Sequence, residues 1–83
     1  MHTTDWSIRI LLDEDGDHTH ARAVLTNRDG VSLHADGDAD RNPGDAPIPE
    51  IGAELAAARA LHAMADLLMD TAAHDVENLS HPV

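Results

Sequence analysis

Two acidic runs are the first candidates for chemistry in this chain, because carboxylates gathered in a loop can hold a divalent cation. They are Asp13-Glu14-Asp15-Gly16-Asp17 and Asp36-Gly37-Asp38-Ala39-Asp40. An EF-hand calcium loop needs glycine at its sixth position and glutamate at its twelfth. The first run has glycine at the fourth position and Val24 at the twelfth, and the second has Arg41 at the sixth and Pro47 at the twelfth. Neither run is therefore expected to be a specific metal site.

Two histidines, His18 and His20, are the second candidates. A spacing of two residues puts both on one face of a strand, where they could chelate zinc or nickel. Strand pairing could bring Asp38 beside His20 as a third ligand. The alternative is a pair of exposed histidines on a solvated sheet face, and this is the interpretation that we favour. We expect no metal and no other cofactor.

The third candidates are arginines on the same sheet face. Alternation along two strands places Arg9 and Arg22 together, and His20 and His34 flank them. These four residues are a possible contact for phosphate or RNA, with Arg9 expected directly opposite Arg22. The alternative is a ladder of arginine and aspartate side chains on a wet sheet, with Asp36 next to Arg22, and we favour this alternative.

Residues suited to catalysis are missing from the sequence. It contains neither cysteine nor lysine that could act as a nucleophile. Ser7, Ser32 and Ser80 lack the surroundings of a nucleophile elbow. No glycine-rich phosphate loop joins a strand to a helix. We expect a protein that is not an enzyme and takes no small-molecule substrate.

The composition limits the fold and the partners. With 83 residues the chain forms one domain with a thin core, which gains from added buried surface. Sixteen acidic and five basic residues give a net charge of −11, which repels phosphate. The first residues do not resemble a signal peptide and no apolar run could span a bilayer, so we expect a cytoplasmic protein without membrane contact.

Hydrophobic periodicity predicts the elements that position these residues. Alternation indicates strands over residues 6–12, 18–27 and 31–39. Their inward residues are expected to be Trp6, Ile8, Ile10 and Leu12; then Thr19, Ala21, Ala23 and Leu25; then Val31, Leu33, Ala35 and Gly37. An acidic loop over residues 13–17 and a turn at Asn27–Gly30 connect them as an antiparallel meander. We expect Leu12 opposite Thr19 and Asn27 opposite Val31.

A long helix is predicted to begin at Pro49, where the missing N–H costs nothing. The stripe expected to pack on the sheet is Ile51, Leu55, Ala58, Leu61, Ala65, Leu68, Ala72 and Val76. A second apolar ladder, expected on the opposite face, is Ala53, Ala57, Ala60, Met64 and Leu67. This ladder is the predicted dimer contact, although alanine could also be present only for its helix propensity. Residues 78–83 are expected to be a loose tail.

One stretch of the chain resembles a small actinobacterial family of unknown function. The residues that carry the resemblance are Asp40-Arg41-Asn42-Pro43, Asp45, Ile48-Pro49-Glu50-Ile51-Gly52, Glu54-Leu55-Ala56 and Ala58-Arg59-Ala60-Leu61. Trp6 and the alternation from Thr19 to Leu25 also match the pattern, so the resemblance covers about residues 5–77. It implies a fold like that of double-stranded-RNA-binding domains, with three antiparallel strands followed by a helix. It also implies a dimer, because a dormancy-associated member, likened to ribosome hibernation promoting factors, forms one.

Two functions follow from these patterns. The resemblance implies a stress- or dormancy-linked dimeric protein that modulates translation through ribosome or RNA contact. The alternative is an acidic interaction module that binds a basic protein and never touches RNA. The predicted fold is α+β, a three-stranded antiparallel meander with one long C-terminal helix on one face.

Overall fold

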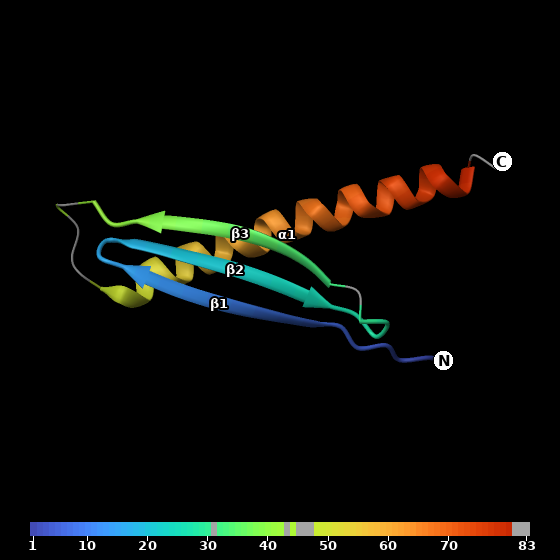
Figure 1. Ribbon diagram of the computed structural model, residues 1–83, viewed down its shortest axis with the longest axis horizontal. Helices are drawn as coiled ribbons and strands as arrows, with labels where there is room; N and C mark the ends of the chain where they lie inside the picture. The colour runs from blue at the N-terminus through green and yellow to red at the C-terminus, as the bar shows by residue number, and fades with distance from the viewer. Residues whose placement is uncertain (31, 43, 45–47, 81–83) are drawn as a thin grey trace.

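Three antiparallel strands followed by one helix form the structure, a computed structural model that describes residues 1–30, 32–42, 44 and 48–80 (Figure 1). The elements are β1 (Ser7–Asp15), β2 (His18–Thr26), β3 (Ser32–Asp40) and α1 (Pro49–Ser80). The strands lie in the order β1-β2-β3. The predicted α+β arrangement is confirmed, as is the helix start at Pro49. Residues 78–80, expected to begin a loose tail, instead form the end of α1. The expected inward position of Val31 and residues 81–83 of the expected tail lie outside the described residues.

The register between β2 and β3 is the predicted one. Leu25 lies opposite Leu33, and Ala23 lies opposite Ala35. The turn between these strands fixes this register, because Gly30 has φ +79 and its N–H donates to the Asn27 carbonyl at 3.1 Å. Only glycine adopts such a φ without steric cost, so the turn residues could be assigned from the sequence.

The register between β1 and β2 differs from the prediction by two residues. Leu12 lies opposite Ala21, whereas Thr19 lies opposite Glu14. The acidic run does not end β1, which continues through Asp15, and the loop contains only Gly16 and Asp17. Gly16 has φ +60, which suits the first position of a two-residue hairpin turn. Trp6, which we expected to be the first inward residue of this strand, precedes β1 and is exposed.

The core lies between α1 and the two strands β2 and β3. Its buried apolar residues are Ala21, Ala23, Leu25, Ala35, Ala39, Ala56, Ala60 and Met64. Most of them are alanine, so the helix can lie very close to the sheet. Gly37 on β3 is also buried and faces the helix backbone. The inward alternation predicted for β2 is confirmed, because Thr19, Ala21, Ala23 and Leu25 are all buried.

The predicted orientation of α1 is wrong, since the face assigned to a dimer contact packs on the sheet. Ala60 and Met64 are buried, and Ala53, Ala57 and Leu67 are partly buried. Of the stripe predicted to be the core, Leu68 is partly buried and the other members, Ile51, Leu55, Ala58, Leu61, Ala65, Ala72 and Val76, are exposed. The cause is steric, because Gly37 leaves no room for large side chains where the helix backbone meets β3, and Ala56 and Ala60 of this face lie there.

The molecule is elongated and exposes more surface than a compact domain. Its radius of gyration is 16.7 Å, against about 12 Å for a compact domain of this length. Its accessible surface is 6514 Å², against roughly 4,800 Å² for a compact monomer of this mass. Figure 1 shows the C-terminal part of α1 extending beyond the sheet. No helix in the described part of the chain combines the length and apolar character needed to cross a membrane.

Candidate functional site

The sheet face turned away from α1, called the outer face, is the surface on which charged side chains gather. Strand alternation places on it Ser7, Arg9, Leu11, Asp13 and Asp15 from β1, His18, His20, Arg22, Val24 and Thr26 from β2, and Ser32, His34, Asp36, Asp38 and Asp40 from β3. One end carries five aspartates. The other end carries Arg9, His34 and uncharged residues, so the outer face is strongly polarised in charge.

Each histidine of the acidic end lies between aspartates of both neighbouring strands. Across the sheet, His20 is opposite Asp13 on β1 and Asp38 on β3. His18 is opposite Asp15 on β1 and Asp40 on β3 in the same way. Cross-strand neighbours on one face interact directly, so these two rows place each imidazole in a negative field.

Hydrogen bonds join the histidines and the β3 aspartates into a zigzag that we call the His–Asp ladder. His18 Nδ1 contacts Asp40 Oδ1 at 2.6 Å, and His18 Nε2 contacts Asp38 Oδ1 at 3.0 Å. His20 Nδ1 contacts the same Asp38 oxygen at 2.7 Å, and His20 Nε2 contacts Asp36 Oδ1 at 3.0 Å. Five residues, three aspartates and two histidines, thus alternate along this part of the outer face.

Arg22 ends the ladder, because its Nε–H donates to Asp36 Oδ1 at 2.9 Å. These partners shift the protonation equilibria. The hydrogen bond to Asp40 raises the pKa of His18 above its usual value, and the hydrogen bond to Asp38 does the same to the pKa of His20. Hydrogen bonds from Arg22 and from His20 lower the pKa of Asp36 and of Asp38, respectively. The ladder therefore favours charged histidines and charged aspartates together.

The four residues proposed for phosphate contact do not form one cationic patch. Arg9 lies opposite Val24, so the predicted Arg9–Arg22 pairing is wrong because of the two-residue difference in register. Arg22 is paired with Asp36, as the Arg–Asp ladder interpretation predicted, and His20 contacts two aspartates. Arg9 and His34 occupy the two ends of one row, with Val24 between them.

Two other arginines stabilise the fold. Arg41 donates from Nε and Nη2 to Asp17 Oδ1 at 2.9 and 2.7 Å, and its backbone N–H donates to the Asp17 carbonyl at 2.8 Å. These bonds hold the β1–β2 turn against the end of β3. Arg59 Nη1 donates to the Asp38 carbonyl at 2.7 Å and so joins α1 to β3. Most of the few cations of this acidic chain thus have intramolecular partners.

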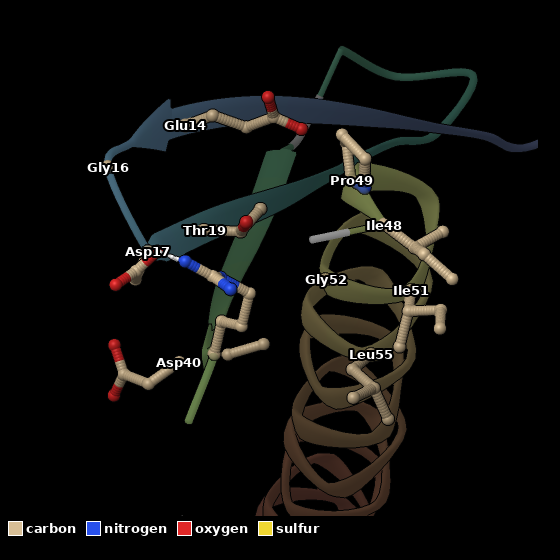
Figure 2. A pocket seen from close by; sticks show the side chains of 12 residues that line it. Glu14, Gly16, Asp17, Thr19, Asp40, Ile48, Pro49, Ile51, Gly52 and Leu55 are labelled. Carbon is tan, nitrogen blue, oxygen red and sulfur yellow. Dashed lines mark hydrogen bonds and ion pairs between the residues drawn. The ribbon is translucent and has the colours of Figure 1, made fainter. Parts of the chain in front are cut away.

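A hollow of about 600 Å³ lies where the β1–β2 turn meets the start of α1. Figure 2 shows the carboxylates of Glu14, Asp17 and Asp40 on its strand side and the apolar side chains of Ile51 and Leu55 on its helix side. Among the described residues, no three His, Cys, Asp or Glu side chains are arranged to hold a metal ion.

Comparison with known proteins shows to which family this chain belongs. The sequence profile of the Rv2632c-like family matches residues 4–83. The chain belongs to the Rv2632c-like family. Two proteins similar to this chain are the uncharacterized proteins Mb1767 of Mycobacterium bovis and MT1780 of Mycobacterium tuberculosis. Each is 38% identical over 80 residues, which cover 92% of this chain and 80% of the relative.

The protein Rv2632c itself is similar to this chain in sequence and in structure. The uncharacterized protein Rv2632c of Mycobacterium tuberculosis is 36% identical over 74 residues, covering 89% of this chain and 78% of the relative. The crystal structure of Rv2632c superposes with a TM-score of 0.88 at 32% identity, over 100% of this chain and 98% of that one. The predicted relationship to a small actinobacterial family is thus confirmed, as is the arrangement of three antiparallel strands followed by a helix.

The sequence analysis did not predict that Asp13 lies beside His20, or that Asp15 and Asp40 lie on either side of His18. The signal that could have found them is alternation, because Asp36, Asp38 and Asp40 follow the same two-residue spacing as His18 and His20. Residues with that spacing share one strand face, and the β2–β3 register then sets them side by side. The length of β1 was the missing information, because the acidic run was interpreted as a loop.

Proposed function

We propose that this protein is a non-enzymatic binding module that works as a homodimer and presents its acidic outer face to a cationic protein partner. The observation that supports the choice of partner is the gathering of five aspartates at one end of the outer face. No described element covers that face, because α1 packs on the other side of the sheet. A face with this charge attracts lysine- and arginine-rich surfaces and repels nucleic acid.

The homodimer is supported by the surface that one chain leaves uncovered. Ile8 and Leu12 point to the helix side of β1 and are each 45% exposed, because α1 packs on β2 and β3. Surface in excess of that of a compact monomer, described above, is typical of a protomer that buries more area on association. Contiguous exposed apolar side chains on a small domain favour a protein interface.

The β1 strand is the edge best suited to pair with a second copy. An unpaired edge strand presents free backbone N–H and C=O groups that can extend the sheet. If two β1 strands pair antiparallel about Leu11, Arg9 lies opposite Asp13 of the partner subunit, which is a favourable pair. On the helix side, Ile10 then lies opposite Leu12 of the partner subunit.

Pairing through β3, the other edge, is disfavoured by charge. An antiparallel pair centred on Asp38 would place Asp38 against its own copy and Asp36 against Asp40 of the partner subunit. Like charges directly opposite each other destabilise strand pairing. Helix packing also differs between the edges, since α1 lies on β3 and leaves β1 uncovered. Self-association is therefore expected at β1.

The second candidate is the function that the resemblance implies, a stress- or dormancy-linked protein that slows translation on the ribosome. The row with Arg9 and His34 at its ends favours it, because these residues lie away from the aspartates on the same face. A contact of this size would neutralise few phosphates, so its salt dependence should be shallow.

The two candidate functions require the outer face to bind ligands of opposite charge, a cationic protein in one case and RNA in the other. We would titrate a labelled lysine-rich peptide and a labelled ribosomal RNA fragment against the parent protein. The variant Asp13→Asn plus Asp15→Asn should weaken peptide binding, because it removes two charges from the acidic end. Asp70→Asn plus Asp75→Asn, which removes two exposed charges from α1, is the matched control and should leave binding nearly unchanged.

The same titrations can contradict the proposal. RNA binding that is lost on changing both Arg9 and Arg22 to alanine, with no peptide binding, would favour the translation candidate. Co-sedimentation of the protein with ribosomal particles on a sucrose gradient of cell extract would point the same way. Peptide binding that is equally weak in both aspartate variants would show that the outer face is not the contact.

A further inference from the structure

Both imidazole rings of the His–Asp ladder have a carboxylate oxygen within hydrogen-bond distance of each ring nitrogen. For His18 the two distances are 2.6 Å to Asp40 and 3.0 Å to Asp38. For His20 they are 2.7 Å to Asp38 and 3.0 Å to Asp36. An ionised carboxylate can only accept hydrogen bonds, so all four contacts require a hydrogen on the histidine nitrogen.

A neutral imidazole cannot satisfy this arrangement. It carries one N–H, and its other nitrogen presents a lone pair. In either tautomer, one lone pair of each ring would face a carboxylate oxygen at 3.0 Å or less, which is repulsive. Only the doubly protonated imidazolium donates at both positions. The geometry of the ladder is therefore that of its proton-loaded state.

We propose that His18 and His20 are doubly protonated imidazolium ions in this structure. When they release their protons, the acidic end of the outer face becomes more negative and each ring loses one hydrogen bond to an aspartate. As a regulatory device this rests on the proposed function, because it would set the affinity of the face for a cationic partner. The physical basis is the loss of two positive charges and of one hydrogen bond per ring.

Most of the charged groups around the two rings favour the binding of a proton. Asp13 and Asp15 face the rings from β1, and Asp36, Asp38 and Asp40 face them from β3. Arg22, two residues from His20 on β2, is one opposing cation, and Asp36 partly neutralises it. The helix α1 packs on the other side of the sheet, and from it Arg59 reaches β3, where its Nη1 donates to the Asp38 carbonyl at 2.7 Å and adds a second opposing cation.

Asp38 couples the two rings, because its Oδ1 accepts from both His18 Nε2 and His20 Nδ1. Each outer aspartate serves one ring, since Asp40 contacts His18 and Asp36 contacts His20. This connectivity predicts a pattern of variant effects that general surface charge would not produce. Removing the charge of Asp38 should affect both histidines, whereas removing that of Asp40 or Asp36 should affect mainly one.

The experiment is an NMR titration of the histidine ring resonances in the intact protein. We expect both midpoints above the ordinary value of about 6.5, with 15N shifts of a doubly protonated ring at pH 6. In Asp38→Asn both midpoints should fall, in Asp40→Asn that of His18, and in Asp36→Asn that of His20. Asp70→Asn on α1 is the control for a general charge effect and should shift neither.

Three results would overturn the proposal. They are midpoints at or below 6.5, a neutral tautomer at pH 6, and equal shifts in Asp38→Asn and Asp70→Asn. Asparagine is nearly isosteric with aspartate and these side chains are solvent-accessible, so the variants are expected to fold. Unchanged backbone amide shifts away from β2 and β3 would verify this.

Binding of the lysine-rich peptide tests the regulatory consequence separately. Its affinity for the parent should rise severalfold from pH 5.5 to pH 8.5, and this rise should be absent from His18→Gln plus His20→Gln. Peptide binding that does not depend on pH in the parent would overturn the switch. If the NMR pattern holds but the peptide does not bind at any pH, the proposed function fails while the proton-loaded ladder stands.

Discussion

Gly37 and Ala60 bring β3 and α1 into backbone contact. A Cβ atom placed on Gly37 would lie 2.3 Å from the Ala60 nitrogen and 2.5 Å from the Ala56 carbonyl oxygen. Backbone atoms cannot rotate away as a side chain can, so the helix and the strand would have to separate. This close approach determines which face of α1 packs on the sheet.

Gly37→Ala should therefore destabilise the protein by about 1–3 kcal/mol, the usual cost of overpacking a core. The measurement is urea unfolding followed by circular dichroism. Gly44→Ala is the matched control, because a Cβ there would meet nothing within 4 Å. Equal stability of the two variants would show that β3 and α1 do not approach this closely.

The burial of Met64 predicts a contrast between two methionines of α1. Met64 is 1% exposed and Met69 is 72% exposed. Met64→Ala should cost about 2–5 kcal/mol, because it leaves a cavity in the core. Met69→Ala should cost much less in the same unfolding assay. A larger loss at Met69 would mean that α1 docks through the opposite face or that Met69 is buried in a dimer.

Pairing of two β1 strands predicts a charge-swap result. Arg9→Glu alone should weaken the dimer, because it sets a carboxylate against Asp13 of the partner subunit, and Asp13→Arg alone should do the same with two arginines. The double variant R9E/D13R should restore the dimer. Sedimentation equilibrium at several concentrations gives the mass of each variant.

A control for the charge swap is Arg28→Glu, which makes the same change in charge in the turn between β2 and β3. It should leave the dimer intact. A parent protein that is monomeric at high micromolar concentration would contradict the dimer itself. A dimer that is indifferent to all four variants would place the interface elsewhere, for example on the exposed apolar stripe of α1.

The pKa shifts of the ladder predict how stability depends on pH. The raised pKa values of His18 and His20 contribute stability that is complete below about pH 6.5 and is lost as the pH rises through the folded-state values. The lowered pKa values of Asp36 and Asp38 contribute stability that is present above about pH 4 and is lost at lower pH. The ladder should therefore stabilise the fold most between about pH 4 and pH 6.5.

Urea unfolding at pH 5.5 and pH 8.5 measures this effect. The parent should be more stable than His18→Gln plus His20→Gln at pH 5.5, and the difference should shrink at pH 8.5. The effect should be modest, because these side chains are solvent-exposed and salt screens them. A difference that grows toward pH 8.5 would contradict the proposed sign.

The sequence by itself determined the elements whose signals are local. The turn glycine Gly30, the alternation in β2 and the proline at the start of α1 act through backbone sterics and burial within a few residues. These features predicted the α+β fold, the β2–β3 register and the helix start. The position of Asp36 beside Arg22 followed from the same register.

Tertiary structure alone decided the helix face and the β1 register. Both faces of α1 are apolar, so periodicity could not distinguish the stripe with Leu55 from the ladder with Met64. The choice depends on the space above Gly37, a contact between segments far apart in the sequence. The acidic residues at the end of β1 become strand because β2 pairs with them, which offsets their low strand propensity and creates the rows around His18 and His20.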